Sequence, residues 1–150
     1  MEVILAEILG NLRDMDYSDK RVEKVAVEWF ELDKRFLRKT TDQGRDVGIN
    51  IESCNRLQQG DVLYINGPNI IVVELSKTEA IVFEPQTMKE MALICYQLGN
   101  RHAPIFLEEN QVLTPLDQTI VSFFNKLNIP VRLERRRLEH VLHPAPSHAH

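Results

Sequence analysis

The hydrophobic pattern of this chain changes near residue 76, and this change limits the folds that the chain can adopt. Before it, apolar and polar residues alternate over short runs, as they do in half-buried β-strands. Val47, Ile49 and Ile51, for example, share one face of an expected strand. Turn sequences such as Asn66-Gly67 separate the runs. We therefore predict that residues 1–75 form a small all-β domain.

Helical patterns appear after the change. At the start of the first helix, Thr87 and Glu90 have capping-box spacing, and Gly99 stands where a left-handed residue would end the helix after Leu98. The apolar stripe expected to face the core consists of Met88, Met91, Ala92, Cys95 and Leu98. A second helix is expected to begin near Pro115, with a stripe of Leu116, Ile120, Phe123, Phe124 and Leu127.

The order of elements predicts the second fold. Expected strands over residues 80–84, 104–107, 111–114 and 131–135 give the order β-α-β-β-α-β within residues 76–137. Right-handed crossovers fold this order into a ferredoxin-like sandwich of two helices on one antiparallel sheet. The predicted fold class is therefore α+β, with an all-β N-terminal domain followed by a ferredoxin-like domain. We expect residues 138–150 to form a mobile tail, in which residues 138–143 are a candidate for a short helix and residues 144–150 contain two prolines and no core-forming material.

Composition excludes several functional classes. No apolar run approaches the roughly 20 residues that cross a bilayer, and the N-terminus lacks the pattern of a secretory leader, so we expect a cytoplasmic protein without a membrane anchor. A net charge of −4 gives no general attraction to nucleic acid. Cys54 and Cys95 are too isolated for a disulfide framework or a cysteine zinc site. No catalytic triad, phosphate loop or HExxH motif is found, which argues against an enzyme.

The histidines are unevenly placed. One of them, His102, follows the first expected helix, and the other four lie in the last eleven residues: His140, His143, His148 and His150. Such a histidine-rich segment is typical of metal binding or of a purification tag, although a tag is normally an uninterrupted run. His102 is either an ordinary surface histidine or a ligand, because one imidazole cannot hold a divalent ion alone. A two-fold dimer would supply a second copy of it.

Arginines gather after the second helix, at Arg132, Arg135, Arg136 and Arg137. Ferredoxin-like domains include RNA-binding modules, but the basic and aromatic signature of those modules is missing here. We interpret the cluster either as a solvated strand end or as a patch for an acidic protein partner.

Several segments together resemble the UreE family of urease accessory proteins along nearly the whole chain. They are residues 8–12, Glu28-Trp29-Phe30, Gly60-Asp61 and residues 94–102. The last segment is the most specific, because it closes on Gly99-Asn100-Arg101-His102.

The resemblance implies a metal site. Members of the family are dimeric nickel carriers, and by position His102 inherits the role of nickel ligand at the dimer interface. A tail histidine completes the site in many members, and here any of His140, His143, His148 or His150 can serve. Zn(II) and Cu(II) also suit imidazole, so the ligands do not select the metal. Some members carry a further histidine pair where this chain has Asn110 and Val112, and that auxiliary site should be absent.

The resemblance also implies a function. The chain is expected to be a homodimeric metallochaperone that carries Ni(II) and delivers it for assembly of the urease active site. Its partners would be the urease-accessory GTPase and, through it, urease and other accessory proteins, with residues 1–75 handling protein partners. The alternatives are a ferredoxin-like interaction module without metal transfer, and a catalytic domain whose active-site residues the sequence does not reveal.

Overall fold

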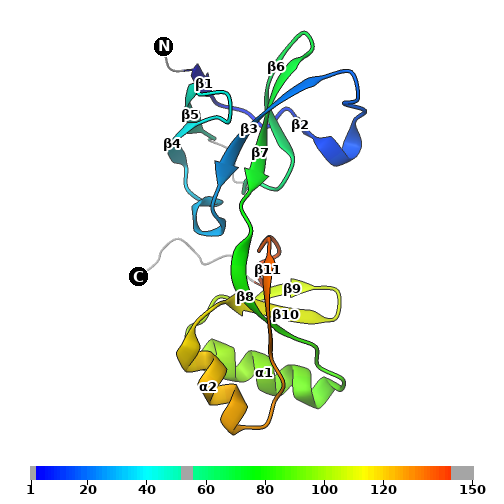
Figure 1. The fold of residues 1–150 in the computed structure, drawn as a ribbon, viewed down its shortest axis with the longest axis vertical. Coiled ribbons are helices and arrows are strands. Elements are labelled where there is room, and N and C mark those ends of the chain that lie inside the picture. Colours follow the sequence, from blue (N-terminus) through cyan, green and yellow to red (C-terminus); the bar gives the residue numbers. More distant parts are fainter. Residues whose placement is uncertain (1–2, 52–55, 143–150) are drawn as a thin grey trace. The chain divides into compact units, whose positions relative to one another are not determined.

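A computed structural model describes residues 3–51 and 56–142 of the chain. It divides the chain into two compact units, Met1–Ser76 and Lys77–His150 (Figure 1). This division lies one residue from the expected domain boundary. Within the described residues, no helix has the length and apolar character needed to span a membrane.

The first unit consists of strands and short 3₁₀ helices. One sheet has the order β1-β5-β4, formed by Val3–Leu5, Asp46–Asn50 and Phe36–Thr40. The other has the order β2-β6-β7-β3, formed by Gly10–Asn11, Asp61–Asn66, Asn69–Leu75 and Arg21–Val27. The 3₁₀ helices are η1 (Leu12–Asp14) and η2 (Trp29–Glu31). β1 pairs with β5 and β3 with β7 in parallel, while the remaining neighbours are antiparallel.

The core of this unit contains the residues that the alternating sequence pattern predicted to share a buried strand face. Val47 and Ile49 are fully buried, and Ile51 is 6% exposed. The connection between β6 and β7 turns at Gly67, whose φ of 63° is the left-handed conformation that the Asn-Gly sequence predicted.

A buried polar contact joins two segments that are distant in the sequence. The Asn11 side-chain amide donates to Asp61 Oδ1 at 3.0 Å and to the Gln59 carbonyl at 2.9 Å. Gly60 lies beside it with a φ of 84°, and a Cβ at this position would stand 3.1 Å from Asn11 Oδ1. Glycine is therefore needed here both for its backbone conformation and for the close approach of Asn11.

The second unit has the predicted ferredoxin-like topology. Its elements in chain order are β8 (Thr78–Phe83), α1 (Met88–Asn100), β9 (Phe106–Glu108), β10 (Gln111–Pro115), α2 (Gln118–Lys126) and β11 (Arg132–Arg136). The sheet order is β11-β8-β10-β9 and all neighbours are antiparallel. Both helices pack on one face of this sheet (Figure 1), where Phe83 stacks edge-on against Phe124 at 4.7 Å between ring centroids.

The predicted stripe of α1 is partly wrong. Ile94 and Leu98 are the buried residues of this helix, and Met91 and Cys95 are half-buried, whereas Met88 is 88% exposed and Ala92 is also exposed. Apolar residues occur on more than one side of α1, so the periodicity could not decide which side meets the sheet. The predicted start was correct, because Thr87 Oγ1 accepts a hydrogen bond from the Glu90 amide at 3.0 Å.

The second helix begins later than predicted. Pro115 belongs to β10, and Asp117 is the N-cap residue, whose carboxylate accepts a hydrogen bond from the Thr119 amide at 2.9 Å. Ile120 and Phe124 are buried as expected, but Leu116 and Leu127 are exposed.

The prediction of a mobile tail is wrong for residues 138–142. Leu138 is fully buried, and Val141 forms an isolated β-bridge with Phe106. The Leu107 amide donates to the His140 carbonyl at 2.9 Å, and the Leu142 amide donates to the Ile105 carbonyl at 2.7 Å. β9 is an edge strand of the sheet, and this segment pairs with the backbone along its outer side. We call residues 138–142 the edge segment; residues 143–150 lie outside the described residues.

An ion pair at the other edge of the sheet yields a pH prediction. Hydrogen bonds from Arg132, and secondarily from Gln111, lower the pKa of Glu84. The resulting stabilisation is present above the unfolded pKa of about 4.3 and is lost as the pH falls from there through the lower folded pKa. Arg132→Met should therefore raise the pKa of Glu84 in an NMR titration. Arg135→Met, which removes the partner of Glu79, is the control and should leave the pKa of Glu84 unchanged.

Candidate functional site

His102 lies in the turn that ends α1. The Ala103 amide donates to the Leu98 carbonyl at 3.0 Å, and the His102 amide donates to the Gly99 carbonyl at 3.0 Å. These two bonds form a Schellman motif, whose left-handed position is occupied by His102 with a φ of 58°. The prediction that the helix ends at Leu98 with a left-handed Gly99 is wrong, because α1 continues to Asn100 and Gly99 is an ordinary helical residue.

A histidine at this position is energetically unfavourable. The left-handed conformation costs a residue other than glycine about 1 kcal/mol or more. α2 ends in the same motif, with Asn128 at a φ of 59°, and asparagine tolerates this conformation better than most residues. The His102 side chain is exposed. Residues in unfavourable conformations are concentrated at functional sites, so the imidazole of His102 is a strong candidate for a ligand.

An exposed apolar stripe leads along α1 toward this histidine. We call it the outer stripe; it contains Met88, Ala92, Tyr96 and Gly99, which share one side of the helix. Tyr96 is 66% exposed. A Cβ at Gly99 would meet nothing within 4 Å, so the helix backbone is open to close approach there. An apolar helix face that the unit itself does not cover is typical of a protein interface.

His102 cannot form a metal site alone. The described residues of one copy contain no group of three histidine, cysteine or carboxylate side chains that could hold an ion. Imidazole nitrogen suits Ni(II), so His102 fits nickel chemically but supplies only one donor per copy. The remaining donors must come from another copy, from the tail or from a partner.

The structure places one of the four tail histidines. His140 belongs to the edge segment; its side chain is exposed and lines a polar cavity of about 740 Å³ that also includes Glu84, Glu108, Gln111 and Arg136. His143, His148 and His150 lie outside the described residues. Leu142, which precedes them, is hydrogen-bonded to Ile105, three residues along the chain from His102. Leu142, the last described residue, therefore lies next to the segment that follows His102, a placement that the sequence did not reveal.

Cys95 contributes little to this site. Cys95 is half-buried in α1 with its Sγ 3.8 Å from the Met91 sulfur, and burial raises the pKa of its thiol. A thiol with a raised pKa is a poor metal ligand at neutral pH, so its role is packing, as predicted. Cys54 lies outside the described residues.

The arginine cluster of β11 is neutralised by carboxylates of its own unit. Arg132 pairs with Glu84 and Glu134, Arg135 lies 3.5 Å from Glu79, and Arg136 pairs with Glu134 and Glu108. Of the two interpretations drawn from the sequence, these pairs favour the solvated strand end over a patch for an acidic partner.

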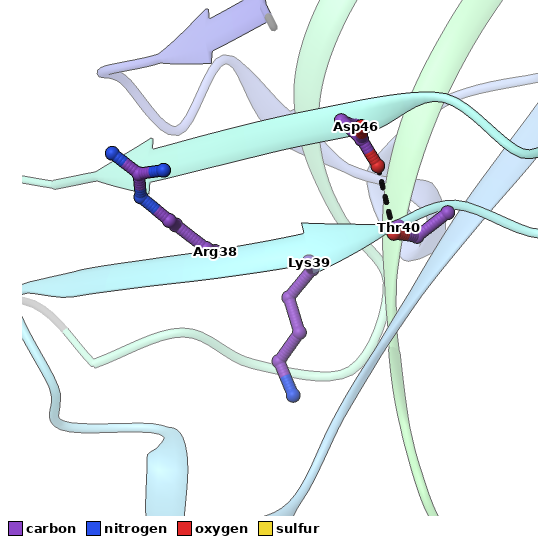
Figure 2. Close-up of a pocket in the computed structure, with 4 residues that line it drawn as sticks. All are labelled: Arg38, Lys39, Thr40 and Asp46. Atoms are coloured by element: carbon purple, nitrogen blue, oxygen red, sulfur yellow. Dashed lines mark hydrogen bonds between the residues drawn. The ribbon is translucent and has the colours of Figure 1, made fainter.

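A cavity in the first unit gathers no ligand set. It measures about 510 Å³ and is lined by Arg38, Lys39, Thr40 and Asp46 on β4 and β5 (Figure 2). Thr40 donates to Asp46 at 2.9 Å, and Lys39 Nζ lies 2.7 Å from Glu31 Oε1. In Figure 2 the Arg38 and Lys39 side chains leave β4 in different directions, so they do not converge on a common ligand.

Comparisons with known proteins match both units. The model of the UreE urease accessory protein N-terminal domain matches residues 5–76, and that of the UreE C-terminal domain matches residues 72–150. The urease accessory protein UreE of Staphylococcus carnosus is 38% identical over 138 residues, covering 91% of this chain and 92% of that protein. The UreE of Acetivibrio thermocellus is 36% identical over 127 residues, covering 85% and 83%, and that of Haemophilus influenzae strain PittEE is 34% identical over 152 residues, covering 98% and 82%.

Proposed function

Because the chain belongs to the UreE family of urease accessory proteins, we propose that it carries Ni(II) and delivers it for assembly of the urease active site. The family is one of accessory proteins rather than enzymes, and its name indicates a role in urease maturation. The observation that carries the proposal is the exposed imidazole of His102, held in a left-handed turn at the end of an uncovered apolar stripe.

In the proposed complex, two copies of the chain pair through their C-terminal units. The outer stripe forms part of the contact and brings the two copies of His102 together across the two-fold axis. One or more of His140, His143, His148 and His150 complete the coordination. A site with few fixed ligands binds its ion moderately and releases it readily, as a carrier must, and Zn(II) or Cu(II) can occupy the same nitrogen donors.

The proposed partners act in the cytoplasm. The urease-accessory GTPase exchanges nickel with this chain and passes it on to urease with the other accessory proteins. Residues 1–75 are assigned to protein contacts, and neither nucleic acid nor a membrane has a part in the process.

Delivery can be tested directly. The nickel-loaded chain should activate the apo-urease assembly in the presence of a chelator that withholds free nickel, because the metal then reaches urease only through the carrier. Urease activity is the measurement, and the same amount of nickel salt with chelator is the control. Activation no greater than in this control would contradict the proposal. It would favour the alternative, a protein-interaction module that does not transfer metal.

The interface can be tested at Tyr96. Tyr96→Glu places a charge on the outer stripe, so we expect the dimer to dissociate and the nickel affinity to fall, while the monomer stays folded. Sedimentation and circular dichroism measure these effects. Tyr17→Glu changes a tyrosine of the first unit that is 43% exposed, and it should leave the dimer intact. A Tyr96→Glu protein that remains a dimer would show that the copies pair through another surface.

A further inference from the structure

Two cations beside the proposed metal site form no ion pair with any described residue. Within the described part of the chain, Arg101 and Lys126 take part in no ion pair and no hydrogen bond from their side chains, unlike the arginines of β11. The nearby Asp117 carboxylate interacts with Arg101 electrostatically but forms no ion pair with it, and its hydrogen bonds come from the Thr119 amide and hydroxyl at 2.9 and 2.6 Å. Arg101 and Lys126 therefore leave positive charge available for an external anion.

The two cations line one cavity. It measures about 380 Å³ and lies between the end of α1 and the outer side of α2, with Gln118, Thr119, Ser122 and Phe123 as its other lining residues. The Arg101 guanidinium lies over the Phe123 ring, 4.1 Å from its centroid. This cation–π contact orients the guanidinium while leaving its N–H edge free to donate.

The geometry favours a carboxylate over a phosphate. Phosphate sites usually rely on free backbone amides at a helix N-terminus or in a glycine-rich loop. Here the first turn of α2 is capped by Asp117, which accepts the Thr119 amide through its carboxylate and the Ile120 amide through its carbonyl. An oriented guanidinium edge matches a planar carboxylate by two parallel hydrogen bonds, and Lys126 adds a second charge.

We propose that this cavity docks a carboxylate-bearing segment of the protein that exchanges nickel with this chain. That the docked protein is the one that exchanges nickel rests on the proposed function. That the docked segment is acidic rests on the positive charges of Arg101 and Lys126. Because Arg101 directly precedes His102, the docked segment lies next to the proposed metal ligand, where the partner's own ligands can reach the ion.

The test is an NMR titration of the metal-free, ¹⁵N-labelled full chain with a blocked tetraglutamate peptide. The amides of Arg101, Ser122 and Lys126 should shift, and the affinity should fall with added salt. In a double variant with Arg101→Gln and Lys126→Gln, the affinity should fall about tenfold. The matched control combines Lys77→Gln and Lys89→Gln, two exposed lysines elsewhere in the unit, and should keep the wild-type affinity.

Other outcomes would overturn the proposal. Two of them concern the NMR signals: amide shifts of equal size with a tetraglutamine peptide, or amide shifts centred on β11. The other two are tighter binding of inorganic phosphate than of the peptide, and dissociation of the dimer by the Arg101 and Lys126 substitutions. His102→Gly should bind the peptide with wild-type affinity, so a failure of the nickel proposal and a failure of the docking proposal give different results.

Discussion

Replacing His102 with glycine is expected to make the metal-free protein more stable and to abolish tight nickel binding. Glycine adopts a φ near 58° without the steric cost that histidine bears, so the free energy of unfolding should rise by about 0.5–1 kcal/mol. The same substitution removes an imidazole from each copy, and with it both symmetric donors of the proposed site. Chemical denaturation measures the stability, and Ni(II) titration calorimetry measures the binding.

Asn128 provides a matched control, because it occupies the same position of the same motif at the end of α2. Asn128→Gly should raise the stability slightly and leave nickel binding unchanged. Tight nickel binding by His102→Gly would place the principal site elsewhere. A loss of stability in His102→Gly would instead mean that the imidazole makes a stabilising contact that outweighs the strain of its backbone.

Removal of the edge segment is expected to destabilise the second unit strongly. A chain that ends at Arg137 lacks the fully buried Leu138 and the backbone bonds to Ile105 and Leu107. We expect the free energy of unfolding to fall by about 2–4 kcal/mol, the usual cost of losing a buried leucine. Thermal or chemical unfolding of the metal-free protein measures the change.

The control is a chain that ends at Leu142. It keeps the whole edge segment and loses His143, His148 and His150, so its stability should match that of the full chain within about 0.5 kcal/mol. Any change in its nickel affinity then reports on those three histidines alone. Equal stability of the two shortened chains would show that the packing of Leu138 contributes little.

Local signals in the sequence determined most of the architecture. The alternation in the first unit placed Val47 and Ile49 in the core, and the Asn66-Gly67 turn was recognised from residue types alone. The order of elements after residue 76 was sufficient for the ferredoxin-like topology, because crossover handedness and antiparallel pairing leave few arrangements of βαββαβ. His102 was singled out as a candidate ligand by the resemblance carried by the Gly-Asn-Arg-His motif and not by any property of a lone histidine, and its role as a ligand stays a prediction.

The tertiary structure decided the features that depend on contacts between distant residues. The buried side of α1 depends on the sheet beneath it, since apolar residues occur on more than one side of the helix. The edge segment pairs with the outer edge of β9, and the cavity at Arg101 is completed by residues of α2, including Phe123, whose ring contacts the guanidinium. Capping, turns and periodicity act within a few neighbouring residues and can be recognised in a short window of sequence. The packing partner of each face and the counter-charge of each ion come from elsewhere in the chain, so only the folded structure shows them.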